Sequence, residues 1–535
     1  MPLVSTFGSA SARALRSVLS WLRISRSLRF DGTAYLNWTP SAGNRKTYTI
    51  SMWVKRAGFG TSQVLFYAGT NSDNKTRLIF SSAGTLQFYD ITGGSTERAK
   101  VYSNAVYLDP RAHMHVLAAV DTTQATPSDR IKLYARGVQI TSLGTASYPS
   151  QNSDLYIGGA NDHRIGAGPT GDTLFYDGLI SEVNYIDGLA LDPSYFGRTD
   201  PATGEWVAKK YRGSYGANGR YFDFSDNSNT TSSTLGKDRS GNGGDATPNN
   251  FTVSDSSLDV PSRYGDDPAA RGNYCTLNPL DMGANLTLSE ANLKVVGTSN
   301  AAYSVVLGTI GVSSGKWYWE VTVGSSAAAN AVGIAKALIN KATYLGNDPY
   351  GYGYFATGDY YAASSGSLTA SYASFTTNDV VGVALDLDSG TLQFYLNGSA
   401  QGSPTTSLSG VFFPAGCDGS SGSVPNLTFN FGQRAFTHTP PTGFKALCTR
   451  NLTDTTVAAP ATFNGNASAS GPSVWANGEI TAITINGNVA VEGTHFRRTA
   501  GGLQIITSSS SYNASGSNTI TAYTPGTPFK YARAA

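Results

Sequence analysis

The chain has 535 residues, which is too long for one ordinary domain and predicts about two to four. Charged residues make up only 14% of the sequence and the formal net charge is +2, so the composition excludes the strongly basic surface that is typical of nucleic-acid-binding proteins. The 60 glycines, the 30 tyrosines and the long Ser, Thr and Asn tracts favour an all-β protein with many short strands and polar turns.

The cysteines and the apolar runs exclude two further classes. Cys275, Cys417 and Cys448 form neither a disulfide framework nor a zinc-binding pattern. No apolar run approaches the roughly 18 residues of a membrane-spanning helix, so we expect no membrane span.

The first predicted element is a basic amphipathic N-terminal arm over residues 1–26. This stretch has no acidic residue, and its leucines and valine follow the i, i+3, i+4, i+7 spacing of one helical face. The residues expected to anchor the chain are Arg13, Leu15, Arg16, Val18, Leu19, Leu22 and Arg23. We interpret the arm as a helix that docks onto a larger assembly or onto copies of the same chain. A disordered arm, a mitochondrial transit peptide and a membrane-surface helix are the alternatives, whereas a secretory signal is not expected because arginines interrupt the apolar core.

Residues 27–200 predict a first β-sandwich. Short alternating strands such as YTISMWV (48–54), HVLAAVD (115–121) and RIKLYARGVQI (130–140) are separated by turn residues. The phrases LRFDGTAYL, ISMWVKR and FYDGLISEVNYIDGLAL resemble the laminin-G/pentraxin branch of the concanavalin A-like sandwiches. The resemblance implies a jelly-roll sandwich over nearly the whole stretch.

Residues 201–285 differ in composition from their neighbours. The stretch is saturated with Gly, Asn, Asp and Ser, as in LGKDRSGNGGDATPNNF, and holds only occasional strand-like runs such as GRYFDF (219–224). This composition is typical of turns and loops. We therefore expect a long surface connector between two sandwiches.

Residues 286–450 return to strand-forming sequence and predict a second β-sandwich. SSGKWYWEVTV (313–323), DVVGVALDLDSGTLQFYLNG (379–398) and LTFNFGQRAF (427–436) occur in this order. These phrases closely resemble the SPRY domain, which is another concanavalin A-like sandwich.

The hexapeptide GTLQFY occurs twice, at 84–89 and at 390–395. In each copy a turn glycine precedes a period-two alternation, which places Leu86 and Phe88, and likewise Leu392 and Phe394, on the inward face of a strand. The second copy ends in an Asn-Gly pair, a strong hairpin signal. Two domains of shared architecture explain the recurrence better than chance.

Residues 451–535 predict a small C-terminal β-sandwich module. EITAITINGNVAVEG (479–493) contains an Asn-Gly hairpin signal, and GGLQIITS and NTITAYTP alternate at period two. We interpret the segment as an immunoglobulin-like or fibre-terminal module. The expected fold is therefore all-β, with tandem concanavalin A-like jelly-roll sandwiches, this small β domain and a short N-terminal helical arm.

The order of these parts resembles virion proteins of tailed bacteriophages, in which a laminin-G-like sandwich, a Gly/Asn-rich connector and a SPRY-like sandwich follow one another. TPSAGNRKTYTISMWVKR, LGKDRSGNGGDATPNNFTV and RGNYCTLNPLD carry this resemblance, which covers residues 27 to about 450. The resemblance implies a structural virion protein. The favoured interpretation is a tail-fibre or receptor-binding component that attaches to a host-surface glycan or protein. A capsid or tail decoration protein, or a fibre-base protein, without host contact is the alternative.

The same resemblance sets expectations for partners and location. We expect other virion proteins to bind the N-terminal arm, and a homo-oligomer in which a trimer is favoured. The protein is expected on the phage tail or capsid surface, after synthesis in the host cytoplasm without a signal peptide. No nucleic-acid partner is expected.

Carbohydrate hydrolysis is a weaker alternative, because some concanavalin A-like sandwiches are β-glucanases. Such enzymes need two carboxylates about 5 Å apart on one strand face. The chain has seven glutamates, and the closest two in sequence, Glu479 and Glu492, do not share a predicted strand. GVSSG at 311–315 matches the nucleophile-elbow pattern, but a strand rather than a helix follows it, so we interpret it as a turn. We therefore expect no catalytic residue and no enzymatic activity.

Metal binding is not expected either. His113 and His115 are two positions apart on a predicted strand and share a face, but a packing role is favoured for them. The Asp-rich turns at 71–75, 223–229 and 238–245 lack the glycine and terminal glutamate of an EF-hand, and Asx-turns explain them. We expect no cofactor; calcium is an alternative without support.

The candidate ligand surface is the aromatic stretch YLGNDPYGYGYFATGDYYAA (344–363), between two predicted strands of the second sandwich. Its tyrosines and glycines are interleaved too densely for a packed core strand, and tyrosine offers a large contact area at low entropic cost. We expect loops that bind a host glycan or protein through Tyr350, Tyr352, Tyr354, Tyr360 and Tyr361. The alternative is that these side chains cover the edge of the sandwich.

Overall fold

The computed structural model describes residue 22 and residues 24–199, 204–261, 272–298, 303–324, 330–363, 368–418 and 426–452, together with short strands after residue 452. These residues form β-sheets and short 3-10 turns, and no α-helix occurs in the described ranges. The all-β fold with tandem sandwiches is confirmed. The chain divides into two compact units, the first formed by Met1–Thr199 and Trp206–Ser262, the second by Asp200–Glu205 and Arg263–Ala535.

The first unit is a sandwich of two sheets, of which sheet 1 has the strand order β10-β9-β8-β3-β13-β1-β18, with β16 also beside β13. All its pairings are antiparallel. Its strands are β1 (Ser27–Asp31), β3 (Thr47–Arg56), β8 (Met114–Asp121), β9 (Ile131–Ala135), β10 (Val138–Gln139), β13 (Asp177–Asp187), β16 (Arg220–Phe222) and β18 (Ser256–Ser257).

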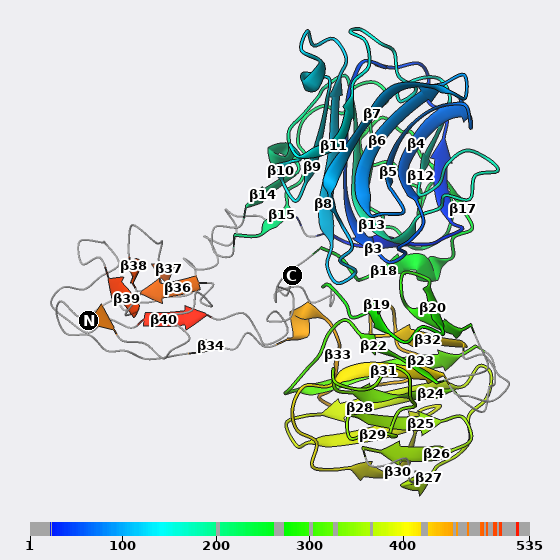
Figure 1. Ribbon diagram of the computed structural model, residues 1–535, viewed down its shortest axis with the longest axis vertical. Coiled ribbons are helices and arrows are strands. Elements are labelled where there is room, and N and C mark those ends of the chain that lie inside the picture. The colour runs from blue at the N-terminus through cyan, green and yellow to red at the C-terminus, as the bar shows by residue number, and fades with distance from the viewer. Residues whose placement is uncertain are drawn as a thin grey trace, which may run out of the picture. The chain divides into compact units, whose positions relative to one another are not determined.

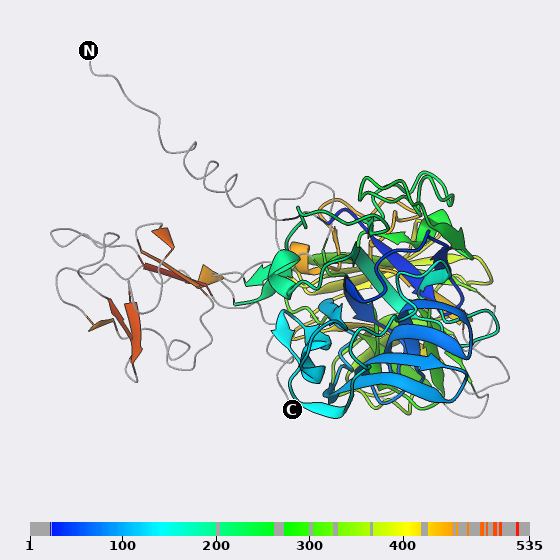
Figure 2. The ribbon, with the colours of Figure 1, turned by 90° about the horizontal axis from the view of Figure 1, so that it is seen from above.

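Sheet 2 has the order β11-β7-β6-β5-β4-β12-β2-β17, and Figure 1 shows its blue to cyan strands side by side in one layer, which can be followed again in Figure 2. Its strands are β2 (Tyr35–Trp38), β4 (Gln63–Asn71), β5 (Asn74–Phe80), β6 (Thr85–Thr92), β7 (Thr96–Val106), β11 (Leu143–Ser147), β12 (Asp162–Ile165) and β17 (Thr247–Asn249). A separate pair, β14 (Gly197–Thr199) and β15 (Trp206–Ala208), and the 3-10 turns η1 (Pro127–Asp129), η2 (Pro193–Tyr195) and η3 (Val253–Asp255) complete the unit.

The core of the first sandwich lies between sheets 1 and 2. Ile50 and Met52 of β3 are fully buried in it, and so are Leu86 and Phe88 of β6, as the alternation of the first GTLQFY copy predicts. Strand β8 is apolar on both faces, because Leu117 is also buried, in a second cluster on the outer face of sheet 1. That outer face therefore needs a cover of its own.

Residues 206–215 supply part of this cover, because Trp206, Ala208, Tyr211 and Tyr215 pack in the clusters on the outer face of sheet 1, and so they differ from the surface connector expected from their composition. Strand β16 pairs with β13, β17 with β2 and β18 with β1. The polar groups in the turns of the segment 206–262 form hydrogen bonds with one another. The carboxylate of Asp238 accepts hydrogen bonds from the backbone N–H groups of Tyr221, Ser240 and Gly244 at 2.8–3.1 Å. The aromatic side chains of this segment are divided between two places: Phe222, Phe224 and Phe251 pack in the core between sheets 1 and 2, and Tyr211 and Tyr215 pack on the outer face of sheet 1.

The second unit contains another two-sheet sandwich. Sheet 3 has the order β19-β22-β31-β24-β25-β26-β27, most of which can be followed down one layer in Figure 1. Sheet 4 has the order β20-β21-β32-β23-β28-β29-β30, with β33 parallel to β23. The strands of sheet 3 are β19 (Leu277–Met282), β22 (Ser304–Gly308), β24 (Ala331–Ala335), β25 (Gly351–Phe355), β26 (Asp359–Ala362), β27 (Ala370–Ser371) and β31 (Phe413–Asp418). Those of sheet 4 are β20 (Leu286–Ser289), β21 (Lys294–Gly297), β23 (Lys316–Val323), β28 (Val380–Asp386), β29 (Thr391–Leu396), β30 (Ser399–Thr405), β32 (Asn426–Asn430) and β33 (Lys445–Ala446).

The second GTLQFY copy lies on β29, and its predicted alternation is confirmed. Leu392 and Phe394 are buried in the second sandwich. Asn397 and Gly398 have φ of 48° and 82°, the left-handed conformation that a tight hairpin turn requires, and β29 pairs with β30 across them.

The C-terminal segment contributes short strands only within its described stretches. β34, β40, β36 and β37 form one sheet, and β35, β39 and β38 form another. Strand β36 pairs with β37 as the predicted hairpin requires. The bounds are β34 (Thr456–Val457), β35 (Ser468–Ala469), β36 (Ala482–Ile485), β37 (Asn488–Val489), β38 (Phe496–Thr499), β39 (Gly502–Ile505) and β40 (Ile520–Tyr523), and the 3-10 turn η4 (Thr449–Asn451) precedes them.

Candidate functional site

The aromatic stretch chosen from the sequence forms strands of sheet 3 rather than a cluster of loops. β24 pairs with β25, and β25 pairs with β26 in a hairpin in which Tyr354 lies opposite Tyr360. Successive side chains of these strands point to opposite faces of the sheet. The five predicted tyrosines are therefore divided between the interior and the outer face of the second sandwich.

Tyr354 and Tyr360 belong to the core, which corrects their assignment to a binding surface. They are only 0% and 2% exposed, and their ring centroids lie 5.5 and 5.7 Å from that of Phe394, on the opposite sheet. The Tyr354 hydroxyl donates to the Ala373 carbonyl, and the Tyr360 hydroxyl is hydrogen-bonded to that of Thr405. Burial raises the pKa of both phenols. Neither side chain is accessible to a ligand.

The other three predicted tyrosines are half-buried. Tyr352 points the same way as Tyr354, and its ring lies 5.9 Å from that of Phe412. Tyr350 and Tyr361 lie on the outer face of sheet 3, where they pack against a cluster formed by the sheet and by the segment 336–350. Only these two of the five predicted residues share a solvent-facing surface.

The glycines of this stretch have a packing role that sequence reasoning missed. A Cβ atom added at Gly353 would lie 2.6 Å from the Cβ of Leu345, and one added at Gly351 would lie 2.8 Å from Cδ1 of Ile339. Both distances are too short for any side chain, so the glycines let the segment 336–350 lie directly on β25. Their alternation with tyrosine marks a covered strand, not a flexible loop.

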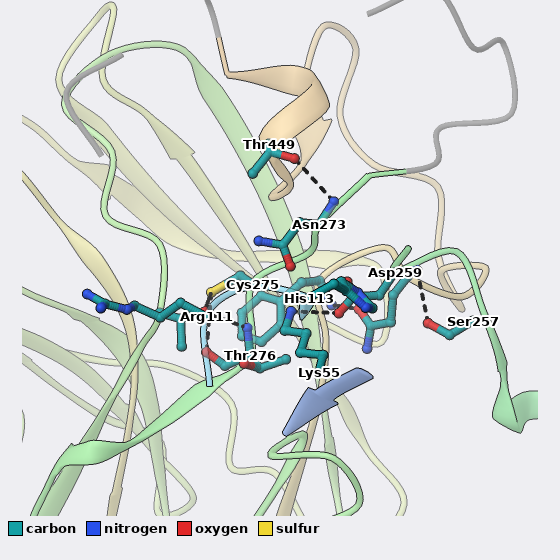
Figure 3. A network of polar contacts seen from close by, with 12 residues as sticks. Lys55, Arg111, His113, Ser257, Asp259, Asn273, Cys275, Thr276 and Thr449 are labelled. Atoms are coloured by element: carbon teal, nitrogen blue, oxygen red, sulfur yellow. Dashed lines mark hydrogen bonds and ion pairs between the residues drawn. The ribbon is translucent and has the colours of Figure 1, made fainter. Parts of the chain in front are cut away.

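The outer face of sheet 1 carries a buried ionic network, which Figure 3 shows from close by. Nζ of Lys55 lies 2.8 Å from Oδ2 of Asp259, and Nε2 of His113 lies 3.0 Å from Oδ1 of the same carboxylate. Burial lowers the pKa of His113, against the opposing effect of Asp259. Burial alone would raise the pKa of Asp259, but Lys55 and His113 lower it, so the carboxylate is ionised and the imidazole neutral. The network ties the covering segment to the sheet.

His115 has a separate structural role. Nε1 of Trp206 donates to its Nδ1 at 3.3 Å, and its Nε2 lies 2.8 Å from Oγ of Ser51, so the neutral ring has both nitrogens occupied. Burial lowers its pKa to about 3. His113 and His115 thus face different partners and do not converge on a common point. Within the described ranges, no group of three or more His, Cys, Asp or Glu side chains is arranged to hold a metal ion.

Two buried glutamates could supply acid–base chemistry, and each is used by the fold. In the second unit, the Glu320 carboxylate accepts the backbone N–H groups of Thr437 and His438 at 2.6 and 2.7 Å. In the first unit, Glu182 accepts a hydrogen bond from the Tyr221 hydroxyl at 2.8 Å. The two glutamates lie on different units, so they do not form the carboxylate pair of a glycosidase on one strand face.

Of the predicted anchoring residues, the structure describes only Leu22. Its side chain is half-buried and packs against a cluster on the outer face of sheet 1 that contains Ile24, Trp53, Ala208 and Val260. Arg13, Leu15, Arg16, Val18, Leu19 and Arg23 lie outside the described residues. The end of the arm is thus attached to its own sandwich, and the docking role of the preceding residues stays a prediction. No helix among the described residues is long and apolar enough to cross a bilayer.

The comparisons with known proteins identify two domains. Residues 30–193 match the family model of the concanavalin A-like lectin/glucanases superfamily, and residues 316–434 match that of the SPRY domain. The chain thus contains a concanavalin A-like (laminin G) domain and a SPRY domain, as the two sequence resemblances predict. The matched segments lie within the two sandwiches, each of which also has strands outside the match.

Similarity to curated proteins is partial. The chain is 28% identical over 182 residues to the ATP-dependent RNA helicase DDX1 of Xenopus laevis, which covers 33% of this chain and 23% of the helicase. It is 31% identical over 138 residues to the E3 ubiquitin-protein ligase TRIM9 of Drosophila melanogaster, which covers 25% of this chain and 18% of the ligase. The chain therefore spans less than a quarter of the length of these relatives.

Solved SPRY domains are also similar to the chain. The SPRY domain of human HERC1 is 18% identical, with a TM-score of 0.25, and the match covers 30% of this chain and 99% of that domain. Another human SPRY domain is 17% identical, with a TM-score of 0.24, and the match covers 29% of this chain and 99% of that domain.

Proposed function

We propose that this protein is a non-enzymatic recognition protein of a tailed-bacteriophage virion, a tail-fibre or receptor-binding component that attaches to a host-surface glycan or protein. The observation that carries the proposal is the tandem of a concanavalin A-like domain and a SPRY domain in one chain of low charge. Sandwiches of this kind present large rigid surfaces, and the order of the two domains resembles phage virion proteins. The relatives named above come from animals and match only part of the chain, so the virion assignment rests on that resemblance.

The carboxylates of the two buried glutamates form hydrogen bonds within the fold, which supports a protein that binds a ligand without catalysis. Glu320 is hydrogen-bonded to two backbone N–H groups, and Glu182 is covered by Tyr221. A retaining glycosidase needs two carboxyl groups about 5 Å apart that face the substrate. Among the described residues, the two buried glutamates form no such pair on one strand, which favours the binding proposal over the weaker hydrolase alternative.

The proposal is tested with the purified full-length chain and a panel of bacterial strains. We expect the chain to co-sediment with cells of a susceptible strain and to release no new reducing ends from their surface polysaccharide. Antibody labelling should place the protein on the tail or capsid of intact particles, and sedimentation velocity should show an oligomer. Sustained release of reducing ends would refute the absence of catalysis. Incorporation into particles without binding to any cell would favour the decoration or fibre-base alternative.

A further inference from the structure

We propose that the outer face of sheet 3 carries a binding site for a neutral glycan, formed by the rings of Tyr303, Tyr344 and Tyr361. This inference deepens the proposed function and rests on it for the biological source of the glycan. The three residues come from separate segments of the chain, namely the residue before β22, the segment 336–350 and strand β26. We call this group the tyrosine patch.

The rings of the tyrosine patch form one continuous aromatic surface. The centroids of Tyr303 and Tyr344 are 4.9 Å apart, and those of Tyr344 and Tyr361 are 5.5 Å apart. The buried ring of Phe355 lies beneath them, 6.0 Å from Tyr344 and 5.2 Å from Tyr361 in edge-on contacts. All three tyrosines are half-buried, so part of each ring faces solvent.

The hydroxyl groups of the patch suit a hydroxylated ligand better than they suit the core. Tyr354 and Tyr360, inside the sandwich, each donate or share a hydrogen bond within the protein. Among the described residues, no hydrogen bond engages the hydroxyl of Tyr303 or Tyr361. Phenylalanine at either of these two positions would fill the same space, so the hydroxyls of Tyr303 and Tyr361 have no packing function. A tyrosine ring with a solvated hydroxyl offers a sugar both an apolar face and a hydrogen bond.

The segment 336–350, which carries Tyr344, is held by its own hydrogen bonds. Oδ2 of Asp348 accepts the backbone N–H of Asn340 at 3.0 Å, and its Oδ1 accepts that of Tyr350 at 2.9 Å. The backbone N–H of Lys336 donates to the Tyr350 carbonyl at 2.8 Å, which closes the segment on itself. A preorganised surface loses little conformational entropy when a ligand binds.

The Lys341 ammonium beside the patch is paired within the protein, so it is not free to bind an anionic ligand. Nζ of Lys341 lies 3.0 Å from Oδ1 of Asp281 and also donates to the carbonyls of Ala337 and Ile339. The Asp348 carboxylate is occupied by the two backbone N–H groups described above. An anionic polysaccharide would find no cation left to pair with among these groups. An extended peptide would be expected to add to a sheet edge, whereas the patch lies on a sheet face.

The experiment uses the full-length chain and an array of neutral oligosaccharides, built from hexoses and N-acetylhexosamines, printed beside sulfated and uronic-acid oligosaccharides. We expect binding to at least one neutral oligosaccharide, with an affinity that changes little between low and high salt. Isothermal titration with that oligosaccharide should show about tenfold weaker binding for Tyr303→Ala and for Tyr361→Ala. The matched control is Tyr395→Ala, a half-buried tyrosine of β29 on sheet 4, which should bind as the unmodified chain does.

A second measurement does not depend on the folding of variants. Nitration of Tyr303 and Tyr361 in the unmodified chain, followed by mass spectrometry, should be slowed by the bound oligosaccharide while nitration of the half-exposed Tyr195 of the first unit is unchanged. The inference is overturned if only anionic oligosaccharides bind, if no oligosaccharide binds, or if neither the variants nor nitration shows an effect at the patch. A change in sedimentation of Tyr303→Ala or Tyr361→Ala without ligand would show instead that the patch joins copies of the chain.

The two failures can be told apart. If the chain adsorbs to cells but the patch variants adsorb equally well, the patch inference fails and the proposed attachment function stands. If neutral oligosaccharides bind at the patch but the chain adsorbs to no cell, the patch stands and the attachment function fails.

Discussion

Replacing Glu182 with glutamine should abolish most of the loss of stability that the first sandwich undergoes as the pH rises from acidic to mildly alkaline values. Glu182 lies on β13, where the register with β3 shifts between Ser181 and Asn184. Its φ of 51° is a strained left-handed conformation, and the residue is only 4% exposed. The Tyr221 hydroxyl donates to its Oε2 at 2.8 Å, a bond that the amide oxygen of glutamine can also accept.

The size of the effect follows from the burial of the carboxyl. Burial raises the pKa of Glu182 from 4.5 to about 8, against the opposing hydrogen bond from Tyr221. A raised pKa in the folded state means that the folded chain holds the proton more tightly than the unfolded chain does. The stabilisation is therefore complete below about pH 4.5 and is lost as the pH rises through about 8. At about 1.4 kcal/mol per pH unit, the loss approaches roughly 5 kcal/mol as an upper limit, a large part of the stability of a typical domain.

Urea unfolding of the full-length chain between pH 5 and pH 9, followed by fluorescence, measures the difference. We expect the first sandwich of the unmodified chain to lose stability progressively above about pH 5, and Glu182→Gln to lose several kcal/mol less. The matched control is Glu97→Gln, because Glu97 lies at the surface, where its carboxylate is 3.2 Å from the Lys100 ammonium. If Glu182→Gln and the unmodified chain show the same pH dependence, Glu182 is already ionised in the folded state and the reasoning is wrong.

Three further substitutions test the packing described above. Asp259→Asn should destabilise the first sandwich by about 3 to 5 kcal/mol, measured by thermal unfolding, because it removes the negative charge 2.8 Å from the buried Lys55 ammonium; an unchanged melting temperature would contradict the network. Tyr354→Ala should cost the second sandwich about 3 to 5 kcal/mol in urea unfolding, as expected for a core aromatic residue, whereas a cost below about 0.5 kcal/mol would return Tyr354 to the surface. Gly333→Ala should prevent folding of the second sandwich, because the new Cβ would lie 1.8 Å from the Tyr352 carbonyl oxygen; a well-dispersed, native-like NMR spectrum of that variant would contradict the packing.

The sequence predicts the sandwiches well because their strands and turns carry local signals. The two GTLQFY copies alternate as expected, and both Phe88 and Phe394 are buried. The hairpin after the second copy follows from Asn397 and Gly398, which need φ above zero. These features depend only on residues that are neighbours in the sequence, so a short stretch of sequence is enough to predict each of them.

The covering segments could not be predicted in the same way, because their role depends on contacts distant in sequence. The segment 206–262 has the composition of a loop, yet its Asp259 is buried against Lys55 on β3. The tyrosines of 350–361 look like a loop because glycines separate them, yet those glycines admit the segment 336–350. One local signal for both covers was present: HVLAAVD on β8 and AVGIA on β24 are apolar without alternation, and such strands are buried on both faces.

The outer faces of sheet 1 and sheet 3 are both apolar and both covered by another segment of the chain. The two covering segments are held by different interactions, and that difference bears on where a ligand can bind. On sheet 1, buried polar groups bind one another within the protein. The Asp259 carboxylate contacts Lys55 and His113, and Glu182 accepts a hydrogen bond from the Tyr221 hydroxyl. A ligand that bound these groups on sheet 1 would have to break the hydrogen bonds and the ion pair between them, and breaking them would cost stability. On sheet 3, backbone hydrogen bonds hold the covering segment, and among the described residues no hydrogen bond engages the hydroxyls of Tyr303 and Tyr361 in the tyrosine patch. Ligand binding to the hydroxyls of Tyr303 and Tyr361 would break none of the hydrogen bonds found among the described residues, and this is the physical reason for proposing glycan recognition on sheet 3 rather than on sheet 1.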